Sequence, residues 1–476
     1  MEPHHAEFMK RGESMKQGAG VAKNKPRTPH LGRSSSEAGA ALRPLILPVY
    51  VPTALQFSGN AAILPILPLI AIRMGFSVSG AAALGLIAGI LSVVGTVPAG
   101  KLMARVGERR AILATGVLLI VLNLGLGAVV GDALAGTPSA WHRWVLIGAL
   151  VVQGACMIVW NLGRQAYLGT HLPPRVRARG VTSFGGAVRI GEILGPLLSS
   201  AVLWVGHAPW VFYLYSVLVA VAVWCVWARM LEGDASPGGK VSDARPATVG
   251  PEGGEAKPAD VEKPREPETV TGALGRQLTF RDMLRVALGV LPLAAARTNR
   301  PIIVPLMAVA MGLTEKDVTL IFGIAAAIEI LLFYPAGVIM DRWGRVAAIV
   351  PCMSILGLGF ALAAPFALGE AGLSAGGAGF AVLLVAQIVA GIGNGLGSGI
   401  MMTLGIDLSN SATRTRDLAR WNTLMGAGRL SAPLLVSLVT LALPVGWAAL
   451  LTSGLLWGGA AWLHRVLPEY APVKLP

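Results

Sequence analysis

Two short stretches of this chain, GKLMARVGERR at residues 100–110 and GVIMDRWGR at residues 337–345, share one pattern and lie 237 positions apart. Each follows a long apolar run and reads Gly, three residues, Ala or Asp, Arg, one residue, then Gly. The same spacing, without a gap, relates Pro68 to Pro305, Gly75 to Gly312, Pro98 to Pro335, Gly154 to Gly391, Pro196 to Pro433 and Trp210 to Trp447. The sequence therefore predicts two copies of one structural unit.

The composition places both copies in a lipid bilayer. Of 476 residues, 54% are hydrophobic and only 13% are charged, and the mean hydropathy is +0.65. A soluble domain carries about 25% charged residues. The net charge of +14 is spread over short loops and the flanking tails, which favours topology signals over a nucleic-acid site. The three cysteines lie inside apolar runs, so we expect packing roles for them.

Twelve apolar runs are long enough to span a membrane, which requires about 20 residues. They cover approximately residues 44–72, 81–103, 111–131, 142–163, 183–204, 210–228, 284–311, 318–340, 346–368, 378–402, 421–444 and 446–463. Residues 232–279 are rich in Pro, Gly, Glu and Lys and predict a flexible linker. We therefore expect an all-α membrane protein: a disordered basic tail (1–43), a six-helix bundle (44–231), the linker, a second six-helix bundle (280–465) and a short tail (466–476).

Loop cations predict the orientation of these spans. Fourteen of them fall on one side of the membrane, whereas only Arg73, Arg143 and Lys316 fall on the other. The positive-inside rule places the richer side, with both termini and the linker, in the cytoplasm. Because six is an even number, both halves then enter from the same side, and the repeat is parallel, about an axis along the membrane normal. We expect a monomer in the inner cell membrane.

With these features the sequence resembles the major facilitator superfamily of secondary transporters over residues 44–465. The family signature G-x-x-x-D-R-x-G-R-R is matched in both halves, although Ala104 stands in place of the acidic residue in the first. The resemblance implies that these two loops gate movement between the halves, with Asp341 acting as a latch. The matching positions are Gly100, Arg105 and Gly107 in the first half, and Gly337, Asp341, Arg342 and Gly344 in the second.

A second motif is similar to the signature of drug/proton antiporters. The fifth span contains Gly191, Gly195 and Pro196 with the spacing G-x-x-x-G-P, and serines follow where the signature ends in two glycines. Small residues allow close helix approach. In the fourth span, Leu150 occupies the place of an arginine that the resemblance associates with proton transfer. The motif favours the twelve-helix drug/proton antiporter subgroup.

Ionisable residues inside the spans are candidate functional sites, because a charge at mid-bilayer costs roughly 2.5–3.5 kcal/mol on insertion scales. Arg189 and Glu192 are spaced i, i+3 on the fifth span and can pair. Glu192 could load and release a proton, or the pair could be a static contact between helices. At the spacing of 237, Glu192 aligns with Arg429 in span eleven, and we expect these two residues to face each other.

Span seven carries Arg297 and Arg300 near its middle, and span eight carries Glu329 at a similar depth. Glu329 can neutralise one arginine, which leaves the other free to bind an anionic or carbonyl-bearing substrate or Glu192. The alternative is a purely structural ion pair. We assign Glu192, Arg189 and Glu329 to proton coupling.

Polar uncharged residues on the spans add to the candidate substrate site. Asn60 aligns with Arg297, and Gln56 lies one turn earlier; both could hydrogen-bond a substrate or simply join helices. Asn161 and Asn394 are weaker candidates, whereas Arg164 and Asp407 are predicted to be interfacial charges. The expected substrate site comprises Arg297, Arg300, Arg429, Asn60 and Gln56.

The sequence contains no phosphate-binding loop and no metal-ligand spacing, so we expect no enzyme activity, cofactor or metal. The favoured hypothesis is proton-coupled efflux of a small organic solute by alternating access. Two alternatives stay open: uptake or exchange of an organic anion, and a membrane sensor that keeps the fold without transport. The expected partners are the substrate, protons and lipid, with no nucleic acid.

Overall fold

A computed structural model describes residues 42–172, 174–230, 279–368, 377–409 and 414–470, which form helices and no strands. The expected linker and most of both tails lie outside these residues. The first half begins with short helical turns at Arg43–Leu45 and Ile46–Tyr50. Its helices are α3 (Val51–Ile63), α4 (Leu67–Arg73), α5 (Val78–Ala83), α6 (Gly85–Val94), α7 (Thr96–Val106), α8 (Glu108–Ala135), α9 (Ala140–His171), α10 (Pro174–Val205) and α11 (Pro209–Arg229).

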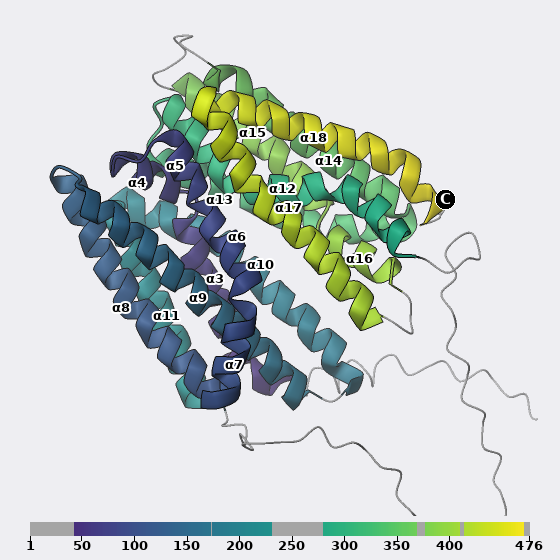
Figure 1. Ribbon diagram of the computed structural model, residues 1–476, viewed down its shortest axis with the longest axis horizontal. Helices are drawn as coiled ribbons and strands as arrows, with labels where there is room; N and C mark the ends of the chain where they lie inside the picture. The colour runs from purple at the N-terminus through teal and green to yellow at the C-terminus, as the bar shows by residue number, and fades with distance from the viewer. Residues whose placement is uncertain (1–41, 173, 231–278, 369–376, 410–413, 471–476) are drawn as a thin grey trace, which may run out of the picture. The chain divides into compact units, whose positions relative to one another are not determined.

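The second half follows the same plan with fewer interruptions. Its helices are α12 (Phe280–Ala310), α13 (Glu315–Arg342), α14 (Arg345–Ala363), α15 (Gly377–Leu396), α16 (Ile400–Asp407), α17 (Arg414–Ala442) and α18 (Val445–Val466). Short 3-10 turns at Ala364–Ala367 and Leu467–Glu469 follow α14 and α18. In Figure 1, the purple-to-teal helices of the first half and the green-to-yellow helices of the second group separately.

Helix packing repeats between the halves. In the first half α3 packs on α10 and α11, and α8 packs on α9 and α11. The equivalent helices of the second half do the same: α12 packs on α17 and α18, and α14 packs on α15 and α18. Since each contact recurs between helices separated by the sequence spacing, the predicted duplication is also a duplication in space.

Backbone geometry repeats at the loops as well. Gly107 after α7 has φ 90° and Gly344 before α14 has φ 88°, and these residues are 237 positions apart. Gly75 and Gly312, with the same separation, have φ 85° and 72°. Positive φ is accessible to glycine at little steric cost. The paired glycines therefore mark sharp turns that both copies require.

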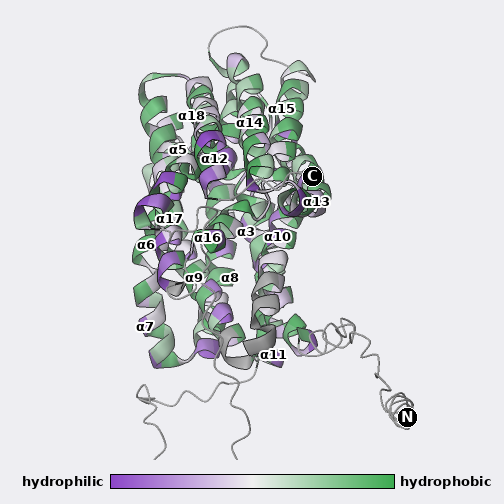
Figure 2. Cartoon of the chain, turned by 90° about the vertical axis from the view of Figure 1, so that its right-hand side faces the viewer, coloured by the Kyte–Doolittle hydropathy of each residue, from purple (hydrophilic) through white to green (hydrophobic). Residues whose placement is uncertain are grey.

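The predicted fold class is confirmed, although hydropathy alone finds fewer spans than expected. Among the described residues, nine helices are long and apolar enough to cross a membrane, and the bent pair Val78–Val94 with Thr96–Val106 would make ten. The two expected spans outside this set are α12, with Arg297 and Arg300 in its middle, and α18, which is rich in Gly and Trp. Both pack within the same bundle, and Figure 2 shows hydrophobic residues along most of α14, α15 and α18.

Three expected spans are broken rather than continuous. The first is interrupted at residues 64–66, around Pro65, and the second bends by 56° near Gly95. The tenth breaks between α15 and α16, where Gly399 adopts a left-handed conformation with φ 78°. Proline removes a backbone donor and glycine tolerates turns. These local effects explain breaks that overall hydropathy does not reveal.

The two halves contact each other mainly through three helix pairs. α10 packs on α13, and α17 packs on α5 and α6. Glycines permit this approach, because a Cβ atom at Gly85 would lie 2.6 Å from Ile302 and one at Gly89 would lie 2.9 Å from Leu430. Arg73 and Glu315 add an ion pair of 3.0 Å between the halves. At the end that carries the two basic loops, α7 makes no comparable contact with α16 or α17 among the described residues, and Figure 1 shows these helix ends apart.

The glycine motif of the fifth span brings α10 against α3. A Cβ atom at Gly191 would lie 2.6 Å from the carbonyl oxygen of Ala54, and one at Gly195 would lie 2.5 Å from that of Ser58. Ser199, one turn later, is fully buried. Close approach of the two helices, as the small residues predict, is confirmed.

This contact predicts the effect of a single methyl group. We expect Gly195→Ala to destabilise the fold by about 1–3 kcal/mol, because overpacking forces backbone shifts. Gly185→Ala is the matched control on the same helix, since a Cβ there meets nothing within 4 Å. Thermal unfolding of both purified variants measures the difference; equal midpoints would show that α3 and α10 are not tightly packed.

Candidate functional site

A cavity of about 420 Å³ lies between α10 and α13, with contributions from α12 and the α15–α16 turn. Four of the predicted site residues line it: Arg189, Glu192, Arg300 and Glu329. Ser398, in the break between α15 and α16, also lines it. Because α10 belongs to the first half and α13 to the second, the cavity lies at the interface between the repeats.

Glu329 is the centre of the hydrogen-bond network in the second half. It forms an ion pair with Arg300, and its second oxygen accepts a 2.7 Å hydrogen bond from the side-chain amide of Asn394. The Arg300 Nε atom donates to Gln387 at 2.9 Å, and its guanidinium lies 5.7 Å from the Phe322 ring. The side chains of Arg300 and Glu329 are only 9% and 19% exposed. Such a desolvated pair depends on its additional hydrogen bonds.

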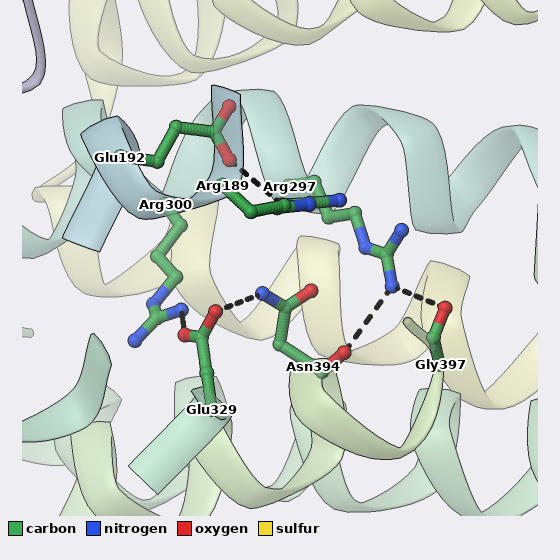
Figure 3. Close-up of polar contacts among 7 residues, drawn as sticks. All are labelled: Arg189, Glu192, Arg297, Arg300, Glu329, Asn394 and Gly397. Atoms are coloured by element: carbon green, nitrogen blue, oxygen red, sulfur yellow. Dashed lines mark hydrogen bonds and ion pairs between the residues drawn. The ribbon is translucent and has the colours of Figure 1, made fainter. Parts of the chain in front are cut away.

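Arg297, one turn before Arg300, has no carboxylate partner among the described residues. Its Nη2 atom donates to the backbone carbonyls of Gly397 at 2.9 Å and Asn394 at 3.3 Å. The break after α15 supplies the Gly397 carbonyl, since the helix ends at Leu396. The Nε atom of Arg297 is buried without a hydrogen-bond partner. Figure 3 shows the two carbonyl contacts of Arg297. Arg297 does not itself line the cavity, although Arg300, one turn further along α12, does.

Arg189 and Glu192 form the predicted i, i+3 ion pair on α10, at 2.8 Å. Their side chains are 45% and 43% exposed, so this pair is far less buried than the one between Arg300 and Glu329. In Figure 3 the Arg189 side chain extends toward Arg297, and the two cations are close enough to interact electrostatically. This α10 pair faces the second-half network across the interface.

The charges of this region do not balance. Two carboxylates, Glu192 and Glu329, accompany three arginines, and each carboxylate is already paired. One positive charge, on Arg297, is left over in a protein interior where electrostatic interactions are strong. The arrangement can attract an anion or a carbonyl oxygen, and it contains no unpaired carboxylate to hold a cation.

Three other predicted substrate residues lie apart from the cavity. Gln56 is fully buried, and its amide contacts Arg164 and the Met157 sulfur. Asn60 on α3 forms no side-chain hydrogen bond within the described residues. Arg429 is exposed and has no hydrogen bond or ion pair among the described residues. The expected contact between Glu192 and Arg429 is not formed, because Glu192 pairs with Arg189. Substrate binding by these three residues stays a prediction.

Arg164 was expected at the interface but is completely buried. α9 continues to His171, seven residues beyond it, so the helix carries the guanidinium into the first bundle. There it contacts Gln56 and the Trp160 carbonyl and lies 5.1 Å from the Trp160 ring. Its Nη1 atom has no partner. The sequence prediction ended this span at residue 163, whereas α9 extends to His171, and this difference explains why Arg164 is buried.

The predicted gating loops have related but unequal contacts. Gly100 and Gly337 stand in open surroundings, whereas Gly107 and Gly344 form the turns already described. Asp341 is 86% exposed and lies 3.8 Å from Arg345, which binds Asp407 more closely at 2.7 Å. The ion pair between Asp407 and Arg345 therefore joins α16 to α14. A latch between the halves at Asp341 stays a prediction, as do the gating roles of Arg105 and Arg342.

Comparison with known proteins agrees with this architecture. The family model described as Major Facilitator Superfamily matches residues 49–295 and 286–476. The chain belongs to this superfamily. No curated protein sequence matches the chain significantly.

Solved structures of transporters share the fold of this superfamily member. A D-xylose-proton symporter has a TM-score of 0.63 at 14% identity, covering 89% of this chain and 98% of that one. A nucleoside transporter has a TM-score of 0.60 at 14% identity, covering 88% and 98%. A POT family peptide transporter has a TM-score of 0.62 at 12% identity, covering 90% and 97%.

These likenesses identify a multi-pass membrane transporter of the superfamily rather than an enzyme. The three transporters are named for different solutes, and identity below 25% carries the fold alone. The fold does not specify the substrate, the coupling ion, the direction of transport or the antiporter subgroup. Arguments about these properties therefore rest on the site residues.

The two ion pairs predict different stabilities on charge removal. Glu329→Gln leaves Arg300 without its carboxylate in a buried site, and we expect a loss of about 3–5 kcal/mol. Glu192→Gln breaks a half-exposed pair and should cost roughly 0–1 kcal/mol. Thermal unfolding at neutral pH compares the two variants. Equal stability losses would contradict the central structural role of Glu329.

Proposed function

We propose that this superfamily member transports a small organic solute that carries an anionic group. The observation that supports this proposal is the uncompensated charge of Arg297, whose guanidinium contacts backbone carbonyls and the Cys352 side chain but no carboxylate among the described residues. An arginine can bind a carboxylate or phosphate through two hydrogen bonds, and an anionic substrate would supply the missing counter-charge. Transport of an organic anion was one of the alternatives that the sequence left open. The excess of positive charge at the site favours an anionic substrate over a cationic one.

Alternating access gives this site its expected mechanism. In this arrangement the halves meet near Arg73 and Glu315, while the ends with the basic loops lie apart. With those loops in the cytoplasm, as the cation distribution predicts, the site opens inward. Rocking of the repeats would separate α17 from α5 and α6 and expose the site to the outside.

Arg297→Gln tests the anionic substrate class. Rapid addition of butyl phosphate, benzoate or tetraethylammonium to proteoliposomes on a solid-supported membrane gives a current when an ion binds or moves. We expect anion-evoked currents in the wild type and a loss of about tenfold or more in apparent affinity in the variant, because a charge-assisted contact contributes about 1.5–3 kcal/mol. Lys316→Gln, which removes a cation near the contact end of α13, is the control. Currents evoked by the cation alone would contradict the proposal.

Proton coupling and export form the second part of the proposal. Both Glu192 and Glu329 line the cavity, each beside an arginine. Movement of α10 relative to α13 would change the neighbours of both carboxylates, and a carboxylate that loses its arginine takes up a proton more readily. The fifth-span motif supports exchange of a proton for an exported solute.

Charge-neutral variants distinguish the two carboxylates. If Glu192 carries the proton, Glu192→Gln abolishes substrate-dependent proton movement in proteoliposomes containing a pH-sensitive dye, while substrate counterflow continues. Glu329→Gln tests the same role for the buried pair. Proton movement that persists unchanged in both variants would exclude proton coupling through these residues.

A further inference from the structure

The cavity at the repeat interface has two chemically different sides. Its charged side consists of Arg189, Glu192, Arg300 and Glu329. Most of its remaining lining is apolar and comes from the facing surfaces of α10 and α13: Ile190, Ile193, Phe322, Ile330, Phe333 and Tyr334. A hydrophilic anion would use only the charged side and leave the apolar side without a partner.

The apolar side is open along one stretch of α13. Nearer its start, α13 packs tightly on α10, since a Cβ atom at Gly323 would lie 2.7 Å from Leu197. Further along, Phe333 is 54% exposed and Tyr334 is 80% exposed, although both line the cavity. The neighbouring Leu331, which does not line it, is 74% exposed. At this level of α13, exposed apolar residues therefore occur both in the cavity lining and beside it.

An apolar surface on a membrane-spanning helix faces lipid chains. Ile190 on α10, which lines the same cavity, is also 54% exposed. These exposed apolar residues of α10 and α13 are the basis for an entrance between the two helices.

We propose that the substrate is an amphiphilic anion that enters sideways from the bilayer between α10 and α13. Its charged group lies near Arg189, Arg297 and Arg300, and its apolar chain lies along Ile193, Ala326 and Phe333. This inference rests on the proposed transport of an anion and adds that the substrate also carries an apolar chain. An amphiphile keeps its apolar part in contact with lipid or protein throughout entry, so that only the charged group leaves the membrane surface for the arginines.

A photoreactive dodecyl phosphate, with a diazirine near the end of its alkyl chain, tests this placement. The full-length protein in lipid nanodiscs is irradiated with the probe, and labelled peptides are quantified by mass spectrometry. We expect labelling of the cavity-facing residues of α10 and α13. Unlabelled dodecyl phosphate should compete, whereas dodecyltrimethylammonium, with the same chain and the opposite charge, should not.

Two adjacent alanines on α13 provide a matched pair of variants. Ala326 lines the cavity, whereas Ala327 is exposed and does not. Ala326→Phe fills the apolar side and should reduce labelling about tenfold or more, as expected from steric discrimination in a pocket. Ala327→Phe adds the same ring to the same helix and should leave labelling unchanged. Thermal unfolding of both variants verifies that they are folded.

Failure of this inference is distinguishable from failure of the proposed function. Butyl phosphate binding, measured by calorimetry in the wild type and in Arg297→Gln, reports the anion site alone. If butyl phosphate binds through Arg297 but the two alanine variants label equally, the amphiphile inference is wrong and anion binding stands. Labelling spread over all lipid-facing helices would likewise contradict the amphiphile inference alone. If neither phosphate binds in an Arg297-dependent way, both proposals are wrong.

Discussion

The cost of placing charge in a medium of low polarity governs this structure. In the second half this cost is offset at Glu329 on α13, which binds Arg300 on α12 and Asn394 on α15 and thereby joins three helices around one carboxylate. Gln387 satisfies the remaining face of Arg300. Because Glu329 pairs with Arg300, Arg297 is left as a surplus charge, held by the carbonyls of a broken helix. A buried charge without a counter-charge is energetically costly unless a ligand supplies one. The substrate site is proposed at Arg297 for this reason.

Duplication explains the frame but not the chemistry. Glycine turns and helix contacts recur in both halves at the same sequence spacing. The ionisable groups of the site do not recur: Asn60 occupies the position equivalent to Arg297, and Arg429 the one equivalent to Glu192. The symmetric residues therefore build the pair of bundles, whereas the asymmetric ones supply the interface charges on which the proposed anion binding rests.

Contact between the halves and the lining of the cavity share the same helices. α10 and α13 pack where Gly323 meets Leu197, and a few turns further along they enclose the charged side of the cavity. Any change in the angle between these helices would alter both features together. The proposed lateral entry and the proposed proton exchange thus depend on one movement.

The membrane location, the helical fold and the duplication could all be predicted from the amino-acid sequence, because hydropathy and recurrent Gly and Pro positions are local properties. Pairing of Arg189 with Glu192, and of Glu329 with one of the span-seven arginines, was also predictable, since intramembrane charges are few and tend to pair; the structure showed that this arginine is Arg300. The folded chain was needed to show that Gln56 binds Arg164, that Gln387 supports Arg300 and that the broken tenth span supplies carbonyls to Arg297. These contacts join residues about 90–110 positions apart, and the rotation of each helix about its axis, on which they depend, is set by packing against neighbours rather than by the local sequence.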